Sequence, residues 1–75
     1  MDPLQYILAE NIKKLRRSMD MSQQDVATRM NVTYQAVSKW ERGRAVPDVF
    51  ALFRLSKIFR CSMDDFFSIE ELNSV

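Results

Sequence analysis

Apolar side chains recur along the chain at steps of three and four residues, the period of an amphipathic α-helix. Asp2 and Pro3 are the residue types that begin a helix, as N-cap and first helical residue. The pattern predicts a first helix over residues 3–18, whose apolar face consists of Leu4, Leu8, Ile12, Leu15 and Met19.

Two short helices are expected next, separated by a sharp turn. Ser22 is an N-cap for a helix at about 23–30, and Thr33 is an N-cap for another. Asn31 lies at the turn between them, where a left-handed backbone conformation is needed and Asn tolerates it. Gly43 is placed to end the second of these helices.

Two further helices complete the predicted fold. Asp48 caps a fourth helix at about 49–60, and Ser62 caps a short fifth one whose Met63, Phe66 and Phe67 are expected to face inward. The fourth helix has a wide apolar arc, which predicts burial on several sides, made of Val49, Ala51, Leu52, Phe53, Leu55, Ile58 and Phe59. The expected fold class is therefore all-α, a compact five-helix bundle.

The segment 22–43 has the form of a helix-turn-helix, two short helices that meet at a steep angle. Small Ala27 lets the helix axes approach, and Val37 and Trp40 fall on the inward side of the second helix. Its outward arc carries hydrogen-bond donors and no acid: Tyr34, Gln35, Ser38, Lys39 and Arg42. A single helix with such a surface fits the major groove of B-DNA.

Charge is unevenly distributed, although the formal net charge is only +1. Residues 13–44 hold eight Lys and Arg against three acids, whereas residues 61–75 hold four acids and no base. A basic middle predicts a polyanionic partner. We expect residues 1–69 to form the DNA-binding domain and residues 70–75 to form a short acidic tail.

Composition excludes several other classes of protein. Seventy-five residues, 47% of them hydrophobic, make one domain with a thin core, and no apolar run is long enough to span a membrane. The absence of His, and Cys61 as the single cysteine, leave no Cys/His metal site, no disulfide and no near-neutral acid–base group. We expect no enzyme activity, cofactor, metal or small-molecule ligand, and a cytoplasmic location. The methionines are expected to fill the core; a methionine-rich binding groove is the alternative.

The chain resembles the lambda-repressor-like (Xre/Cro) helix-turn-helix family over about residues 9–67. Three runs carry the resemblance: Ile12-Lys13-Lys14-Leu15-Arg16, Met21 to Ala27 (MSQQDVA), and Val32 to Gly43 (VTYQAVSKWERG). The family implies a five-helix bundle, usually a homodimer, that binds operator DNA and regulates transcription in bacteria and phages.

The resemblance also implies roles for individual residues. The base-facing positions are Tyr34, Gln35 and Lys39, with Ser38 beside them, and the expected phosphate contacts are Gln23, Thr33, Arg42 and Arg44. Arg16 and Glu41 match a structural salt bridge. Gln suits the N6/N7 edge of adenine and Lys the O6/N7 edge of guanine, so Gln35 and Lys39 are the expected sequence readers.

One departure from the family pattern bears on assembly. Phe50 falls on the polar side of the fourth helix, where the family usually has a charged or polar residue. A symmetric dimer needs a contact patch, and Phe50 is a candidate for it. We therefore expect a transcriptional regulator, and more narrowly a repressor, that binds a pseudo-palindromic operator as a dimer. The alternative is a protein-interaction module or antitoxin that keeps the fold and acts through a partner protein.

Overall fold

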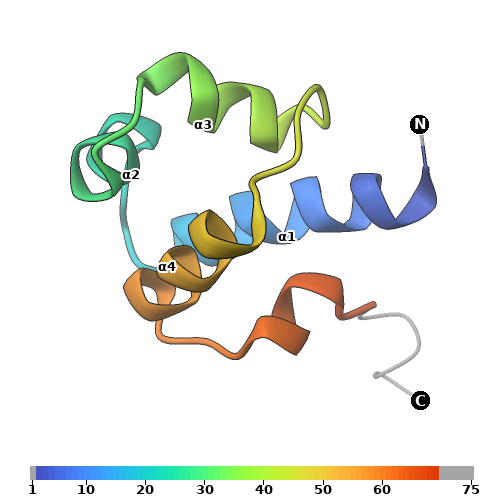
Figure 1. Ribbon diagram of the computed structural model, residues 1–75. Helices are drawn as coiled ribbons and strands as arrows, with labels where there is room; N and C mark the ends of the chain where they lie inside the picture. Colours follow the sequence, from blue (N-terminus) through green and yellow to red (C-terminus); the bar gives the residue numbers. More distant parts are fainter. Residues whose placement is uncertain (1, 70–75) are drawn as a thin grey trace.

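The computed structural model describes residues 2–69, which form four α-helices and one short 3-10 helix (Figure 1). The elements are α1 (Pro3–Ser18), α2 (Gln23–Met30), α3 (Tyr34–Glu41), α4 (Val49–Phe59) and η1 (Met63–Phe67). This described part contains no strand, and the all-α prediction is confirmed. The predicted acidic tail, residues 70–75, lies outside the described residues.

The prediction of five α-helices is wrong, because the last segment makes only the five-residue 3-10 helix η1. Ser62 and Asp65 do form a capping box at its start. Asn11 on α1, however, donates from Nδ2 to the carbonyl oxygens of Phe66 at 2.8 Å and Ser68 at 2.9 Å. These bonds fix the backbone at the end of η1, where Ser68 is already extended, so the helix stops there.

Each α-helix begins at a polar cap that satisfies an otherwise unpaired backbone N–H. The cap side chains are Asp2, Ser22, Thr33 and Asp48, each accepting from an amide two or three residues on. The first residues of all four helices can therefore be predicted from short polar residues in the sequence.

Each α-helix also ends in the same way, with one residue in the left-handed conformation. The next N–H then returns to the carbonyl five residues earlier, as in Met21 to Arg16 and Arg44 to Lys39. The four left-handed residues are Asp20, Asn31, Gly43 and Arg60, with φ between 56° and 70°. Only one of them is the glycine that this conformation favours.

The core lies between the four α-helices and η1. Phe59 and Phe66 place their ring centroids 6.4 Å apart and join α4 to η1. Trp40 points inward, as predicted, and is 8% exposed. The buried apolar cluster consists of Leu8, Ile12, Val26, Ala27, Met30, Val37, Trp40, Leu52, Leu55, Phe59 and Phe66.

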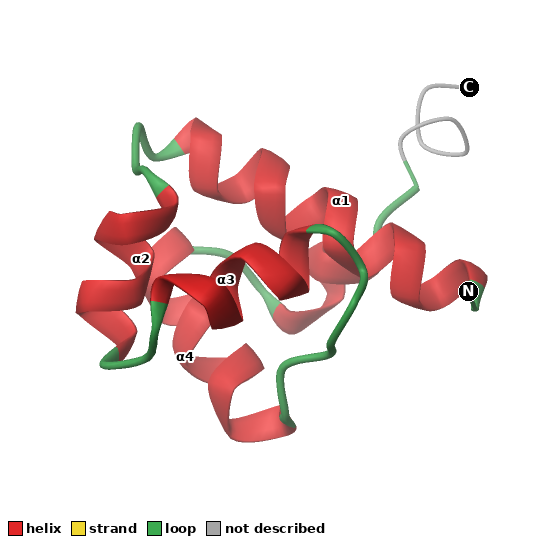
Figure 2. Ribbon diagram, turned by 90° about the horizontal axis from the view of Figure 1, so that it is seen from above, coloured by secondary structure: helices red, strands yellow, loops and turns green. Residues whose placement is uncertain are grey.

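Helix α3 lies at the outside of the bundle. In Figure 1 it crosses above α1 and α4, while η1 lies on the opposite side, and in Figure 2 it is the helix nearest the viewer. It packs against α2 and α1. One long side of α3 therefore faces away from the rest of the protein. None of the helices within residues 2–69 is long and apolar enough to cross a membrane.

Two expectations about inward-facing residues are wrong. Helix α4 is not buried on several sides, because Val49 is 63% and Phe53 52% exposed. The helix packs only through the side that carries Leu52, Leu55, Ser56 and Phe59. On η1, Phe66 fills the core while Phe67 faces outward and is exposed. The short bundle has neighbours for one side of α4 only, which leaves an apolar surface uncovered.

Candidate nucleic-acid interface

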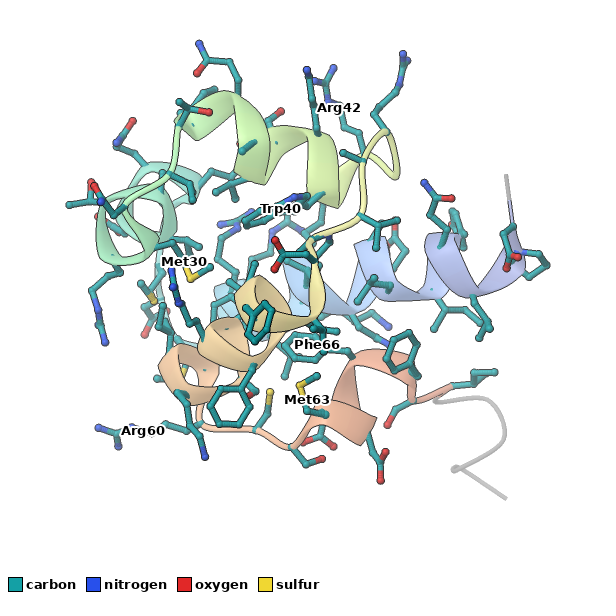
Figure 3. All side chains as sticks on the ribbon, in the orientation of Figure 1. Met30, Trp40, Arg42, Arg60, Met63 and Phe66 are labelled. Carbon is teal, nitrogen blue, oxygen red and sulfur yellow. The ribbon has the colours of Figure 1, made fainter. Side chains whose placement is uncertain are left out.

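The outward side of α3 is a surface of hydrogen-bond donors. Gln35, Lys39 and Arg42 are exposed, Tyr34 is 47% exposed, and Ser38 is half-buried. Figure 3 shows Arg42 pointing outward from α3 and Trp40 lying on its inner side. The inward residues fix the rotation of the helix about its axis, so the five donors are presented together to the solvent.

The two ends of α3 carry the candidate phosphate contacts. At the start, the Thr33 Oγ1 accepts from the Ala36 amide at 3.1 Å, which leaves its hydroxyl hydrogen as a donor. At the end, Arg42 donates from Nε to the Ser38 carbonyl oxygen at 3.3 Å, and Arg44 is exposed just beyond Gly43. Positive and donor groups thus flank the central polar surface on both sides.

Gln23, the fourth candidate phosphate contact, has its side chain turned toward the protein. It is half-buried and donates from Nε2 to Oε1 of Glu41 at 3.0 Å. One of the two hydrogens on the side-chain amide nitrogen is therefore used in an internal bond. The backbone N–H of Gln23, at the first position of α2, is also suited to an anion.

Arg16 and Glu41 form a buried ion pair between α1 and α3. Arg16 donates from Nε to Oε2 at 2.7 Å and from Nη2 to Oε1 at 3.0 Å. Its Nη1 also donates to the carbonyl oxygen of Met21 at 2.7 Å, in the corner between α1 and α2. Such bidentate pairs are geometrically strict, so this one sets the position of α3 relative to α1 and the corner.

Two positioning contacts have weak signals in the sequence. Gln5 donates from Nε2 to the Gly43 carbonyl oxygen at 2.8 Å and ties the start of α1 to the end of α3. Nothing in the local pattern marks this pair, which lies 38 residues apart. Asn11 does leave a signal, since it is a polar residue between the apolar Leu8 and Ile12 on the inner side of α1.

An apolar surface lies next to the end of α3 and is called here the α4 patch: Val46, Val49, Phe50 and Phe53. All four are more than half exposed, and Phe50 reaches 75%. Lys57 lies over the Phe53 ring, with Nζ 4.9 Å from the centroid. A groove of about 530 Å³ runs beside Phe50 and Val46. Contiguous exposed apolar surface of this kind marks interaction sites on small soluble domains.

Cys61 is half-buried beside the start of η1. Burial raises the pKa of its thiol, and the Asp65 carboxylate raises it further. A raised pKa lowers the thiolate fraction at neutral pH, and the thiolate is the reactive form. The residue is suited to packing and not to redox chemistry.

Comparison with known proteins gives a consistent result. A family model described as helix-turn-helix matches residues 12–66. The "HTH-type transcriptional activator BcrR" of Enterococcus faecalis is 35% identical over 63 residues, which are 84% of this chain and 31% of that protein. The "HTH-type transcriptional regulator DicA" of Escherichia coli (strain K12) is 34% identical over 55 residues, which are 73% of this chain and 41% of that protein.

The fold has a close match among solved structures. The solution structure of the SOS-response transcriptional repressor LexA from Eubacterium rectale superimposes with a TM-score of 0.86 at 24% identity, covering 96% of this chain and 77% of that one. The chain belongs to the helix-turn-helix family, and both of these curated relatives are named HTH-type transcription regulators. It spans about a third to two fifths of the length of the two curated relatives.

Proposed function

We propose that this chain binds double-stranded DNA sequence-specifically, as a homodimer on a pseudo-palindromic operator, and represses transcription in a bacterial or phage-infected cytoplasm. One observation carries the proposal: the outward side of α3 presents Tyr34, Gln35, Ser38, Lys39 and Arg42 together, with no acid among them. The single acid of α3, Glu41, is buried and neutralised by Arg16. Every one of the five side chains can donate a hydrogen bond, and none carries a negative charge that a phosphate would repel.

The proposed contacts divide into two kinds. Gln35 and Lys39 read base edges, with Tyr34 and Ser38 against the neighbouring methyl and sugar groups. Thr33, Arg42 and Arg44 hold phosphates, and Gln23 does so through its backbone N–H at the start of α2. The first kind gives choice of sequence, and the second gives register and most of the salt dependence.

The α4 patch supplies the proposed dimer contact, with Phe50 at its centre. A two-fold axis makes the same patch face itself, so the exposed aromatic and aliphatic side chains of two copies cover each other. The patch lies at the start of α4, directly after the loop that follows α3. Two α3 helices are thereby set side by side, and reading successive major grooves requires them to be about 34 Å apart.

Selection of bound duplexes from a random pool tests the proposal. The affinity for the selected duplex is then measured by fluorescence polarisation. We expect an inverted repeat with half-sites one helical turn apart and submicromolar affinity that falls steeply with salt. Gln35→Ala should relax the preference at one base pair in each half-site, by about 1–3 kcal/mol of discrimination. Unchanged preference in this variant contradicts the role of Gln35, and the absence of any salt-sensitive duplex binding contradicts the function.

Phe50→Asp tests the dimer separately from DNA contact. A buried charge at the centre of the patch should shift the chain to monomer in sedimentation velocity and weaken binding to the full inverted repeat. Binding of the monomer to a single half-site should remain. Arg17→Gln, an exposed change on α1 that lowers the net charge by the same single unit, is the control for charge. A Phe50→Asp chain that still dimerises excludes the α4 patch as the interface.

The same assays separate the alternative role. An antitoxin or interaction module that acts only through a partner protein would have the same fold, and its oligomeric state would not distinguish it. Its α3 surface, however, would contact no DNA. Such a chain binds no duplex at micromolar concentration, whatever the salt.

A further inference from the structure

A second groove of the protein is lined by residues of α2, α4 and the corner between α1 and α2. It has a volume of about 610 Å³ and lies where α2, α4 and the corner between α1 and α2 meet. Its lining residues are Met19, Met21, Asp25, Thr28, Arg29, Lys57, Ile58 and Arg60. Figure 3 shows Arg60 on the side of the molecule opposite to Arg42. The Arg60 end of this groove therefore lies away from the side on which α3 is proposed to bind a duplex.

The rim of the groove is strongly basic. Arg29 on α2 and Lys57 and Arg60 at the end of α4 are all exposed. Within residues 2–69, none of the three forms an ion pair, and the contact of Lys57 is with the Phe53 ring. Three cations held close together at low salt repel one another, and an anionic partner relieves that repulsion.

The acid of the groove does not neutralise the rim. Asp25 accepts a hydrogen bond from the Ser22 amide at 2.8 Å in the capping box that starts α2. Its carboxylate is therefore hydrogen-bonded at the start of α2 and points toward Ser22. The three cations Arg29, Lys57 and Arg60 outnumber this one carboxylate, so the groove keeps a net positive charge.

The floor of the groove is apolar and adaptable. Met19, Met21 and Ile58 are half-buried and pack against the core, so their upper surfaces form the base between the charged side chains. Unbranched, polarisable methionines adjust to the shape of a partner and occur at protein surfaces that bind varied peptides. An anion alone would use the rim, whereas an apolar side chain is needed to cover this floor.

We propose that this groove is a docking site for an acidic, amphipathic segment of a partner protein, with apolar side chains on the Met19, Met21 and Ile58 floor and carboxylates on Arg29, Lys57 and Arg60. The site is separate from the α3 surface, so the partner and DNA bind the same molecule together. This role does not depend on DNA binding. The described residues include no separate sensor domain. Binding of a partner protein in this groove would provide a way to regulate the chain.

The probe is a synthetic ten-residue peptide of alternating Glu and Asp with Leu and Phe, titrated into the full chain labelled with ¹⁵N and with ¹³C in the methionine methyl groups. Expected shifts centre on the methyl groups of Met19 and Met21 and on the amides of Arg29, Ile58 and Arg60. Lys57→Glu combined with Arg60→Glu should weaken binding at least about tenfold. The matched control, Lys13→Glu with Arg17→Glu, makes the same change of charge on α1 and should bind within about twofold of the parent.

Each of the following results would overturn the proposal. Shifts confined to the α3 surface would show that the peptide merely mimics DNA there. If the Lys57→Glu/Arg60→Glu chain bound the peptide as tightly as the parent chain, the basic rim would not be part of the site. Equal binding of a peptide with Ser in place of Leu and Phe, or tighter binding of single-stranded oligothymidylate in the groove, would show a plain anion site or a nucleic-acid site.

Duplex titration of the same variants distinguishes this proposal from the proposed function. The Lys57→Glu/Arg60→Glu chain should keep its affinity for the selected duplex while losing the peptide. Parallel loss of both ligands would make the groove part of the DNA interface and overturn the inference. A parent chain that binds the peptide in the groove but binds no duplex would contradict the proposed function and leave this inference standing.

Discussion

Gln23 and Glu41 are joined by a hydrogen bond of 3.0 Å, from Nε2 of the first residue of α2 to Oε1 of the last residue of α3. The same carboxylate accepts two further bonds from Arg16 on α1. One buried anion is therefore shared by three helices. It holds the end of α3, while Val37 and Trp40 pack the inner side of this helix into the core.

Removal of this carboxylate should be among the most damaging single changes in the chain. Glu41→Ala leaves the Arg16 guanidinium buried without its partner, and breaking a buried pair costs about 3–5 kcal/mol. A domain of this size has a total stability of only about 5 kcal/mol or slightly more. We expect a large fall in the urea midpoint measured by circular dichroism. A loss below about 1 kcal/mol would contradict the buried-pair assignment.

Replacement of both partners separates the ion pair from the packing around it. Arg16→Met with Glu41→Leu removes both charges and keeps similar volume, a change that is often neutral for stability. The double variant should be clearly more stable than Glu41→Ala alone. It does not regain the parent level in full, because the Met21 carbonyl oxygen and the Gln23 amide lose their partners.

Arg60 offers a stabilising change. It ends α4 in the left-handed conformation at φ 56°, which costs a residue with a Cβ about 1 kcal/mol relative to glycine. Arg60→Gly should therefore raise the free energy of unfolding by up to about that amount, without a change in the denaturant slope. Arg60→Ala is the matched control: it removes the same charge but keeps the Cβ, and should give no gain. Equal stabilisation by both variants would trace the effect to charge.

Arg44 should contribute to DNA affinity without contributing to sequence choice. It is exposed beyond the end of α3, at a proposed phosphate contact. Arg44→Ala should weaken binding to the selected duplex and to unrelated duplexes by the same factor. Each lost contact lowers the slope of log affinity against log salt by about 0.9, so a dimer loses about twice that. A change in the preferred sequence, seen by repeating the selection, would move Arg44 into the base-reading group.

The helix starts could be predicted from the sequence because they depend on local chemistry. Ser22 and Thr33 each accept a hydrogen bond from a backbone N–H three residues further along the chain. Such a local bond can be predicted without knowledge of the rest of the fold. The inward positions of Val37 and Trp40 follow likewise from the helical period. These local signals are sufficient to predict which side chains of α3 face the solvent.

The remaining features depend on what neighbours a helix finds. Periodicity shows that α4 has a wide apolar arc, but not that the bundle covers only one side of it and leaves Val49 and Phe53 exposed. The position of Gln23 predicts a phosphate contact, but it does not show that the side chain also donates to a carboxylate 18 residues away. Arg60 in the left-handed conformation has no marker, since the sequence offers no glycine there.

Asp25 should make the stability of α2 depend on pH. The pKa of its carboxyl is lowered below its ordinary value, first by the Ser22 backbone N–H and then by the Ser22 hydroxyl. Because the folded pKa is lower than the unfolded one, the stabilising contribution is present above the unfolded pKa and is lost as the pH falls through the folded pKa. The capping box should therefore weaken in acid, and α2 should begin to fray from its start.

NMR titration of the Asp25 side-chain carbon checks this directly, in the native chain and in urea. The native midpoint should lie below the midpoint in urea. Ser22→Ala removes the hydroxyl but keeps the backbone donor, which is the larger cause, so it should raise the native midpoint only part of the way. A native midpoint at or above that of the unfolded chain would show that the capping box does not favour the charged carboxylate.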